Sequence, residues 1–326
     1  MSNVLTSNSL IKSLKRRAMI PNDQETFEDS DFLDMLNEEI QYFGIPHLLS
    51  TYEEYLVVSQ DFPLTSGTFE FDIPERAIGN KLRGVFFADS SDTSGENLSD
   101  LTRIKLEDVP DYSNYNNNFI NGTNSVYYVK DNKLVLVDEQ PYSGGSLRMF
   151  FYIKPSKLVE EDRAGVISNI DRTAGTITLS NFPVDFSNLP LMDFVQTKSP
   201  NKILKYDITP TSVNSNTKTI TFATTDIPSN LVVGDYVNFA QESIVPQLPT
   251  ELHGILAQRV AVAALEALGD FEGMDKAQSR LSKMETATLT ILDNRVESDV
   301  EKIRNRDSAL QQTGRGGSGF GRRGKF

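Results

Sequence analysis

Apolar residues recur at helical spacing towards the C-terminal end of the chain, and this stretch organises the interpretation of the rest. Between residues 249 and 310 the pattern predicts two helices separated by Gly269 and Asp270. Several alanines make the first helix slim, so a neighbouring helix can approach it closely. The second runs from about Gly273 to about Ala309, or about 50 Å at 1.5 Å per residue. A long helix with a narrow apolar stripe needs a partner, which is either another part of the chain or another subunit.

The N-terminal end shows the same period. Residues 2–17 predict a short helix with a basic cluster, and residues 27–49 predict a longer one that Asp29, Ser30 and Asp31 can cap. Gly44 and Pro46 predict a break or a kink near its end.

The pattern changes to alternation in the middle of the chain, where aromatic and branched residues predict strands. The predicted strands cover residues 55–58, 68–73, 82–87, 101–106, 125–130, 133–137 and 147–153. Asp131 and Asn132 tolerate positive φ and predict a tight hairpin between two of them.

Residues 164–240 contain a weak internal repeat. The stretch GTITL at residues 175–179 matches KTITF at 218–222, and MDFV at 192–195 matches GDYV at 234–237. The two matches are offset by 43 and 42 residues, and each copy is predicted to be rich in strands. Two such copies predict a small β-barrel or sandwich.

These patterns predict an α+β protein in which N- and C-terminal helices form a helical hub with a large antiparallel β insertion. The predicted parts are N-terminal hub helices at 1–55, an antiparallel β region at 56–160 and a small barrel or sandwich at 161–245. Long C-terminal hub helices follow at 246–310, and a flexible basic tail at 311–326 closes the chain. The alternative is three independent domains.

Charge is distributed unevenly along the 326 residues, whose formal net charge is −13. Residues 302–326 carry seven basic residues against one acidic residue, so residues 1–301 carry a charge of −19. An acidic body does not by itself bind a phosphate backbone, because such binding depends on Lys and Arg. The chain has no cysteine, which excludes disulfides and thiolate metal sites, and no apolar run is long enough for a membrane span. Residues 1–20 lack the pattern of a signal peptide.

Motifs for catalysis are absent from the sequence. His47 and His253 stand outside any ligand or catalytic spacing, so a structural role is the expected one for each. The chain has no GxSxG, GxGxxG or phosphate-loop motif. Acidic clusters such as Glu53 and Glu54 are typical of solvated surfaces. We therefore expect no enzyme, no metal site and no cofactor.

The tail at residues 313–326 contains six glycines and four cations, a composition typical of disorder in isolation. Three roles fit it. Arg and Gly can contact nucleic acid, the segment can order in a groove of a protein partner with Phe320 and Phe326 filling pockets, or it can act as a solubilising end.

Three stretches resemble the bacteriophage head-to-tail connector family, whose members are also called adaptor or head-completion proteins. They are DFLDMLNEEI at residues 31–40, FDIPERAIGNKLRGVF at 71–86, and residues 249–281, with ELH at 251–253 and AALEALGD at 263–270. Together they cover 59 residues, about a fifth of the chain. The repeat at 164–240 lies outside the resemblance.

The resemblance implies a structural virion protein that forms a dodecameric ring, joins the portal protein to the tail and surrounds the DNA channel. It places the protein in the neck between capsid and tail, and in the host cytoplasm during assembly. Its implied partners are portal protein, tail or further ring proteins, other copies of itself and genomic DNA that passes without specific binding, with no membrane. The acidic body suits such a channel because like charge repels phosphate.

C-terminal extensions in the family commonly dock on the portal. The resemblance therefore assigns portal or partner binding to Ile303, Arg304, Arg306, Arg315, Phe320, Arg322, Arg323, Lys325 and Phe326. It assigns helix packing between subunits to Leu281, Met284, Leu292 and Val296. Two alternatives stay open, a tail- or fibre-attachment protein and a nucleic-acid-binding virion protein that uses its Arg/Gly tail.

Overall fold

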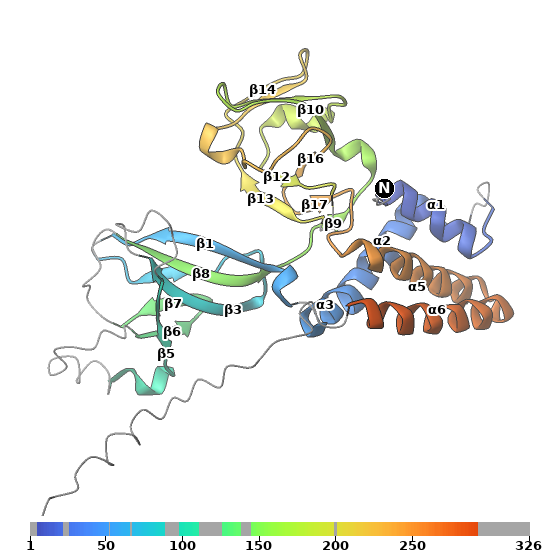
Figure 1. The fold of residues 1–326 in the computed structure, drawn as a ribbon, viewed down its shortest axis with the longest axis horizontal. Helices are drawn as coiled ribbons and strands as arrows, with labels where there is room; N and C mark the ends of the chain where they lie inside the picture. Colours follow the sequence, from blue (N-terminus) through green and yellow to red (C-terminus); the bar gives the residue numbers. More distant parts are fainter. Residues whose placement is uncertain are drawn as a thin grey trace, which may run out of the picture. The chain divides into compact units, whose positions relative to one another are not determined.

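The fold is mixed α+β, as the sequence predicts, with N-terminal helices packed against a C-terminal helix pair and several antiparallel sheets in between (Figure 1). The computed structural model describes residues 5–21, 26–51, 53–65, 67–88, 98–110, 126–137, 145–198 and 201–292. The predicted tail at 311–326 lies outside the described residues, and so does the part of the predicted long helix that follows residue 292.

The hub contains helices from both ends of the chain. They are α1 (Ser7–Arg17), α2 (Asp29–Glu39), the π-helical η1 (Ile40–Gly44), α3 (Ile45–Thr51), α5 (Thr250–Leu268) and α6 (Phe271–Leu292). α5 packs against α1, α2 and α6. Its alanines Ala257, Ala261 and Ala264 are fully buried, which lets these neighbours approach closely. Gly269 ends α5 in the left-handed conformation, at φ +74°.

Of the predicted break or kink near Gly44, the break does not occur, because the helix continues from α2 through η1 into α3. η1 absorbs the proline by widening to a π-turn, in which the amide of Ile45 donates to the carbonyl of Ile40. A side-chain carbon at Gly44 would come within 3.1 Å of Leu248, so the glycine serves close packing and does not end the helix.

Two four-stranded sheets form the first β region around a shared apolar core. One has the order β1-β8-β3-β4 and the other the order β2-β7-β6-β5. The strands are β1 (Val57–Pro63), β2 (Glu70–Asp72), β3 (Ala77–Ala88), β4 (Leu98–Asp100), β5 (Thr102–Arg103), β6 (Val126–Lys130), β7 (Lys133–Leu136) and β8 (Ser146–Ile153). Asp131 and Asn132 both have positive φ and join β6 to β7 in the predicted hairpin. The strand predicted at 101–106 is shorter than expected, because a 3₁₀ turn, η3 (Leu106–Asp108), ends it.

Seven strands form the second β region, in the order β13-β12-β16-β10-β11-β15-β14, around a core of its own. They are β10 (Gly165–Asp171), β11 (Thr176–Leu179), β12 (Met192–Val195), β13 (Ile203–Ile208), β14 (Ser212–Asn214), β15 (Thr219–Thr221) and β16 (Tyr236–Phe239). We call residues 164–240 the repeat module. β9 (Lys157–Leu158) and β17 (Glu242–Ser243) pair in parallel where the chain enters and leaves it.

The two copies of the repeat pair with each other around a local pseudo-twofold axis. Ile177 of β11 lies opposite Ile220 of β15, its own equivalent at an offset of 43 residues. The backbone bonds follow the same symmetry, since Leu179 donates to Lys218 and Phe222 donates to Gly175. A duplicated sequence whose copies face each other therefore builds the core of this module.

Candidate interaction site on the helical hub

Only part of the predicted site lies among the described residues. Leu281 is buried in the hub core and Met284 packs against it, so the chain's own helices cover this part of α6. Leu292 is the last residue of α6, but its side chain is outside the described set, as is Val296. The predicted partner-binding residues Ile303, Arg304, Arg306, Arg315, Phe320, Arg322, Arg323, Lys325 and Phe326 also lie outside the described residues.

Arg259 links three helices of the hub. From α5 its Nε donates to Glu39 Oε2 at 2.6 Å, and its Nη1 donates to Glu285 Oε1 at 2.8 Å. Glu39 ends α2 and Glu285 belongs to α6, so one guanidinium holds α2, α5 and α6 together. Hydrogen bonds between charged groups are stronger than neutral ones, and the fork of Arg suits two carboxylates.

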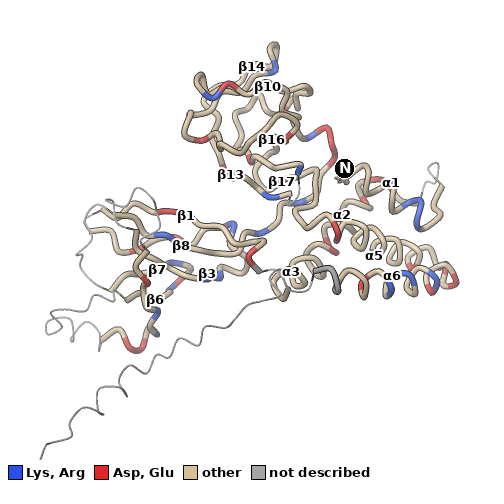
Figure 2. The backbone as a smooth tube through the Cα atoms, viewed as in Figure 1, with Lys and Arg blue, Asp and Glu red and all other residues tan. Residues whose placement is uncertain are grey.

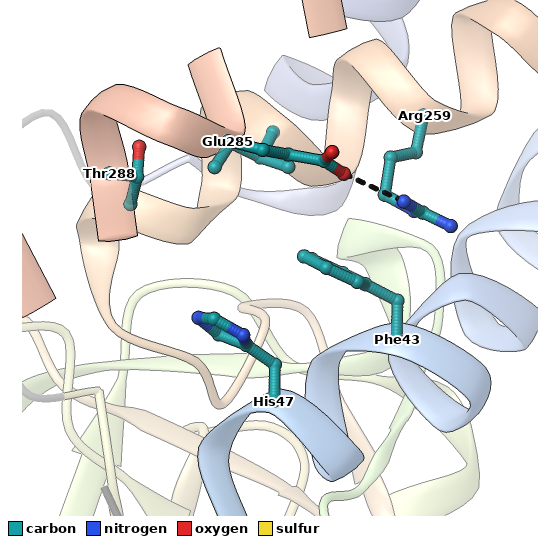
Figure 3. A pocket seen from close by; sticks show the side chains of 6 residues that line it. Phe43, His47, Arg259, Glu285 and Thr288 are labelled. Carbon is teal, nitrogen blue, oxygen red and sulfur yellow. Dashed lines mark hydrogen bonds and ion pairs between the residues drawn. The ribbon is translucent and has the colours of Figure 1, made fainter. Parts of the chain in front are cut away.

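Two rings stack beneath this cation (Figure 3). The guanidinium carbon of Arg259 lies 4.3 Å from the centre of the Phe43 ring, within the range of a cation–π contact. The His47 ring lies 5.4 Å from Phe43, with the planes 15° apart. Burial lowers the pKa of His47, and the charge of Glu285 opposes this shift, so the imidazole is kept neutral more readily than in water.

A cavity of about 280 Å³ opens beside this stack, lined by Phe43, His47, Ile255, Arg259, Glu285 and Thr288. Its wall combines apolar ring faces with a cation and an anion that already neutralise each other. Such a lining suits an uncharged aromatic or amide side chain of a protein partner better than an isolated ion.

The sequence did not reveal Arg259 as a site residue. A signal was present, because Gln258 and Arg259 interrupt an otherwise apolar stretch of the helix. Both are tied inside the hub, and Gln258 donates to the carbonyl of Ala277 in α6 at 3.1 Å. A polar pair within a buried helix therefore marked the junction of α5 with its neighbours.

A second charged junction joins the two β regions. Arg76, which precedes β3, donates to Asp193 Oδ2 at 2.9 Å and to Asp207 Oδ1 at 3.2 Å. Arg76 is 4% exposed and Asp193 is fully buried. Desolvation raises the pKa of Asp193, while the charge of Arg76 and backbone donors from Asp207 and Gln241 oppose the rise. The pair fixes the repeat module to the strand that begins after Arg76.

The described residues give two further findings. Within them, no three His, Cys, Asp or Glu side chains are placed to hold a metal ion. No helix in the same ranges has the length and apolar character that a bilayer crossing requires.

No protein-family model matches the chain, and a search of curated proteins gives no match either.

Proposed function

We propose that the chain is a structural protein of a bacteriophage virion, an adaptor that forms a ring between portal and tail. The resemblance of three stretches to the head-to-tail connector family suggests this role. The portal protein, tail or further ring proteins and other copies of the chain are its partners, and genomic DNA passes along the channel without specific binding.

One observation carries the proposal, which is that a single hub includes helices from both ends of the chain while the sheets lie between them in sequence. The Arg259 fork holds α2 to the C-terminal pair α5 and α6. A closed hub gives a rigid base, and the inserted sheets provide surfaces for neighbouring proteins. The resemblance implies the same organisation, with two of its stretches in α2 and in α5 with the first half of α6.

Charge supports the same role. The strongly acidic body repels the phosphates of DNA, so it can surround a genome without holding it. The basic residues after position 302 are suited to an acidic groove on a portal protein.

Truncation after Ala309 tests the proposal. We expect the shortened chain to keep the unfolding temperature of the full chain and to lose capture by the portal protein of the same phage. Thermal unfolding of the full and shortened chains measures the first property, and their masses, each alone and mixed with portal, measure the second. Undiminished capture of the shortened chain would contradict docking through the C-terminal segment.

The Arg/Gly composition of the tail favours one other function, nucleic-acid binding. Filter binding across a salt series separates the two. A steep salt dependence that disappears when Arg315, Arg322, Arg323 and Lys325 are replaced would favour nucleic-acid binding. A tail- or fibre-attachment protein would instead show contact through its β regions in negative-stain images of the mixture with portal.

A further inference from the structure

Basic residues lie at the end of α1 and along α6, where acidic residues also occur (Figure 2). The basic face consists of Arg16 and Arg17 on α1 and Arg280 and Lys283 on α6. Arg17 connects the two helices, because its Nη1 contacts Met284 Sδ at 3.7 Å and donates to Gln258 of α5 at 3.0 Å. The face is therefore held together by the fold.

This face carries positive charge that its own surroundings leave uncompensated. Burial lowers the pKa of Arg17, and the charges of Arg280 and then Arg16 lower it further. Arg16, Arg280 and Lys283 are exposed, and none has an ion pair among the described residues. Lys15 and Lys276, by contrast, pair with Asp29 and Glu272. An unpaired cluster of like charge in an acidic protein is suited to an anionic partner.

The outer side of α2 and η1 has the opposite character. The acidic face consists of Asp31, Asp34, Glu38 and Tyr42, all exposed. These residues follow each other at spacings of three and four, so they share one side of the helix. Tyr42 is 76% exposed at the end of this row. An exposed tyrosine beside carboxylates is a good partner for arginines, which stack on its ring while they pair with the acids.

We propose that the basic face binds the acidic face of a second copy of this chain. Three arginine and lysine side chains without ion pairs would meet a row of carboxylates of similar length, and Tyr42 would stack on a guanidinium. Asp34 forms an ion pair with Lys157 at 3.3 Å, in which both side chains stay exposed, and Asp31 accepts the amide of Glu28. No described ion pair joins the two faces to each other within one chain.

A second copy fits better than a nucleic acid. Residues 1–301 carry a net charge of −19, so a nucleic acid and a second copy are both repelled at long range, but the acidic face alone offers a short row of carboxylates fixed on one helix. Charges that far apart are screened at 0.1 M salt, beyond about 10 Å, so the contact between the two faces decides the binding. The contact joins two different surfaces, so it can repeat head to tail and close into a ring. Ring closure rests on the proposed function, but the pairing of the two faces does not.

Reciprocal charge reversal tests the contact. One variant carries Arg16→Glu, Arg280→Glu and Lys283→Glu, and the other carries Asp34→Lys and Glu38→Lys, all at exposed positions. We expect the wild-type chain to assemble at about 0.1 M salt and to dissociate at about 1 M, where charges are screened within about 3 Å. Each variant alone should stay monomeric, and an equal mixture should assemble again. Native mass spectrometry measures the oligomeric state of the wild-type chain, of each variant and of the mixture.

Tyr42→Ser and Arg280→Glu are milder single variants, each expected to weaken self-association about tenfold or more. Gln278→Glu, an exposed change on α6 outside the basic face, is the matched control and should have no effect. A monomeric wild-type chain at low salt, variants that still assemble alone, or a mixture that stays monomeric would each overturn the proposal. So would a basic face whose reversal abolishes DNA binding and leaves self-association unchanged.

The portal experiment remains independent of this test. Chains that self-associate through the two faces but fail to capture portal would count against the adaptor function and would support the contact. Chains that capture portal as monomers and never pair would count against the contact alone.

Discussion

His253 shows how a single side chain can be structural and yet sensitive to pH. It lies fully buried in the first turns of α5, and its Nε2 is 3.1 Å from the carbonyl oxygen of Leu248. Burial lowers the pKa of His253 from 6.5 to about 4, although carbonyl contacts with Leu248 and Pro246 favour the protonated ring. The sequence-based expectation that this histidine is structural rests on missing motifs, and burial gives the physical reason for its neutral state.

The unfolded chain binds a proton at His253 below pH 6.5, whereas the folded chain does so only near pH 4. The stabilising contribution of neutral His253 is therefore complete above pH 6.5 and is lost as the pH falls to about 4. We expect this one group to remove about 3 kcal/mol from the free energy of unfolding over that window.

Urea unfolding of the wild-type chain and of His253→Gln, measured between these pH values, isolates the contribution by difference. The free energy of unfolding should depend less steeply on pH in the variant, because glutamine binds no proton at this position. His47→Gln is the matched control and should change the slope less, because His47 is only partly buried. Equal slopes for the wild type and His253→Gln would contradict the assignment.

Glycine and lysine occupy equivalent turns of the repeat module, which offers a test at the scale of an element. Gly175 has φ +70° and Lys218 has φ +55°, at an offset of 43 residues. Asp171 and Asn214 support the two turns in the same way, each accepting two amide hydrogen bonds through one side-chain oxygen. A side-chain carbon at Gly175 would collide with a backbone oxygen, that of Phe222.

Gly175→Ala should therefore cost about 2 kcal/mol or more, from left-handed strain and the collision together. Lys218→Ala is the matched control and should change stability by about 0.5 kcal/mol or less, since an L residue already occupies that turn. Thermal unfolding of the two variants measures the difference. Similar losses of stability in the two variants would show that the surrounding backbone shifts to relieve the collision.

The sequence predicted the helices and strands better than it predicted which of them pack together. Helical spacing identified the hub helices, and Asp131 with Asn132 identified the hairpin, because these signals are local. The continuation through Gly44 could not be predicted, since it depends on packing against Leu248, about two hundred residues away. The Arg259 fork was missed for the same reason, because Glu39 lies 220 residues from it in sequence. An apolar helix face such as the one that includes Leu281 shows that another segment packs against it. It does not show whether that segment belongs to the same chain.

At the scale of the whole molecule, separate apolar cores are joined by a few buried polar contacts. The hub and the repeat module each bury a core of their own. Arg76 ties the first β region to the module, and Asn37 of α2 ties the hub to β9 by exchanging two hydrogen bonds with Leu158. Ile203 and Tyr206 of the module add an apolar contact with the first β region, so the cores should unfold together while the polar and apolar contacts persist.

Arg76→Ala tests that coupling. Removal of the cation leaves the buried carboxylate of Asp193 without its countercharge, at a cost of about 3–5 kcal/mol. Its pKa, already raised by desolvation, should rise further, so the loss relative to wild type should be greatest near neutral pH and smaller in acid. Calorimetry should show the single transition of the wild-type chain divided into two.

Lys276→Ala removes the exposed pair with Glu272 and should cost about 0.5 kcal/mol or less. Adding Asp193→Asn to Arg76→Ala should recover part of the stability, because no buried charge then remains. A loss in Arg76→Ala as small as that in Lys276→Ala would show that water replaces the cation.

The parallel pairing of β9 with β17 has a consequence for how such a chain can change over time. Lys157 donates its amide to Gln241, so the polypeptide departs for the repeat module and comes back at neighbouring points. A segment whose two ends meet can be lengthened, shortened or exchanged for an unrelated one without rerouting the helices that support it. Proteins that share this hub can therefore carry very different domains inserted at the same position.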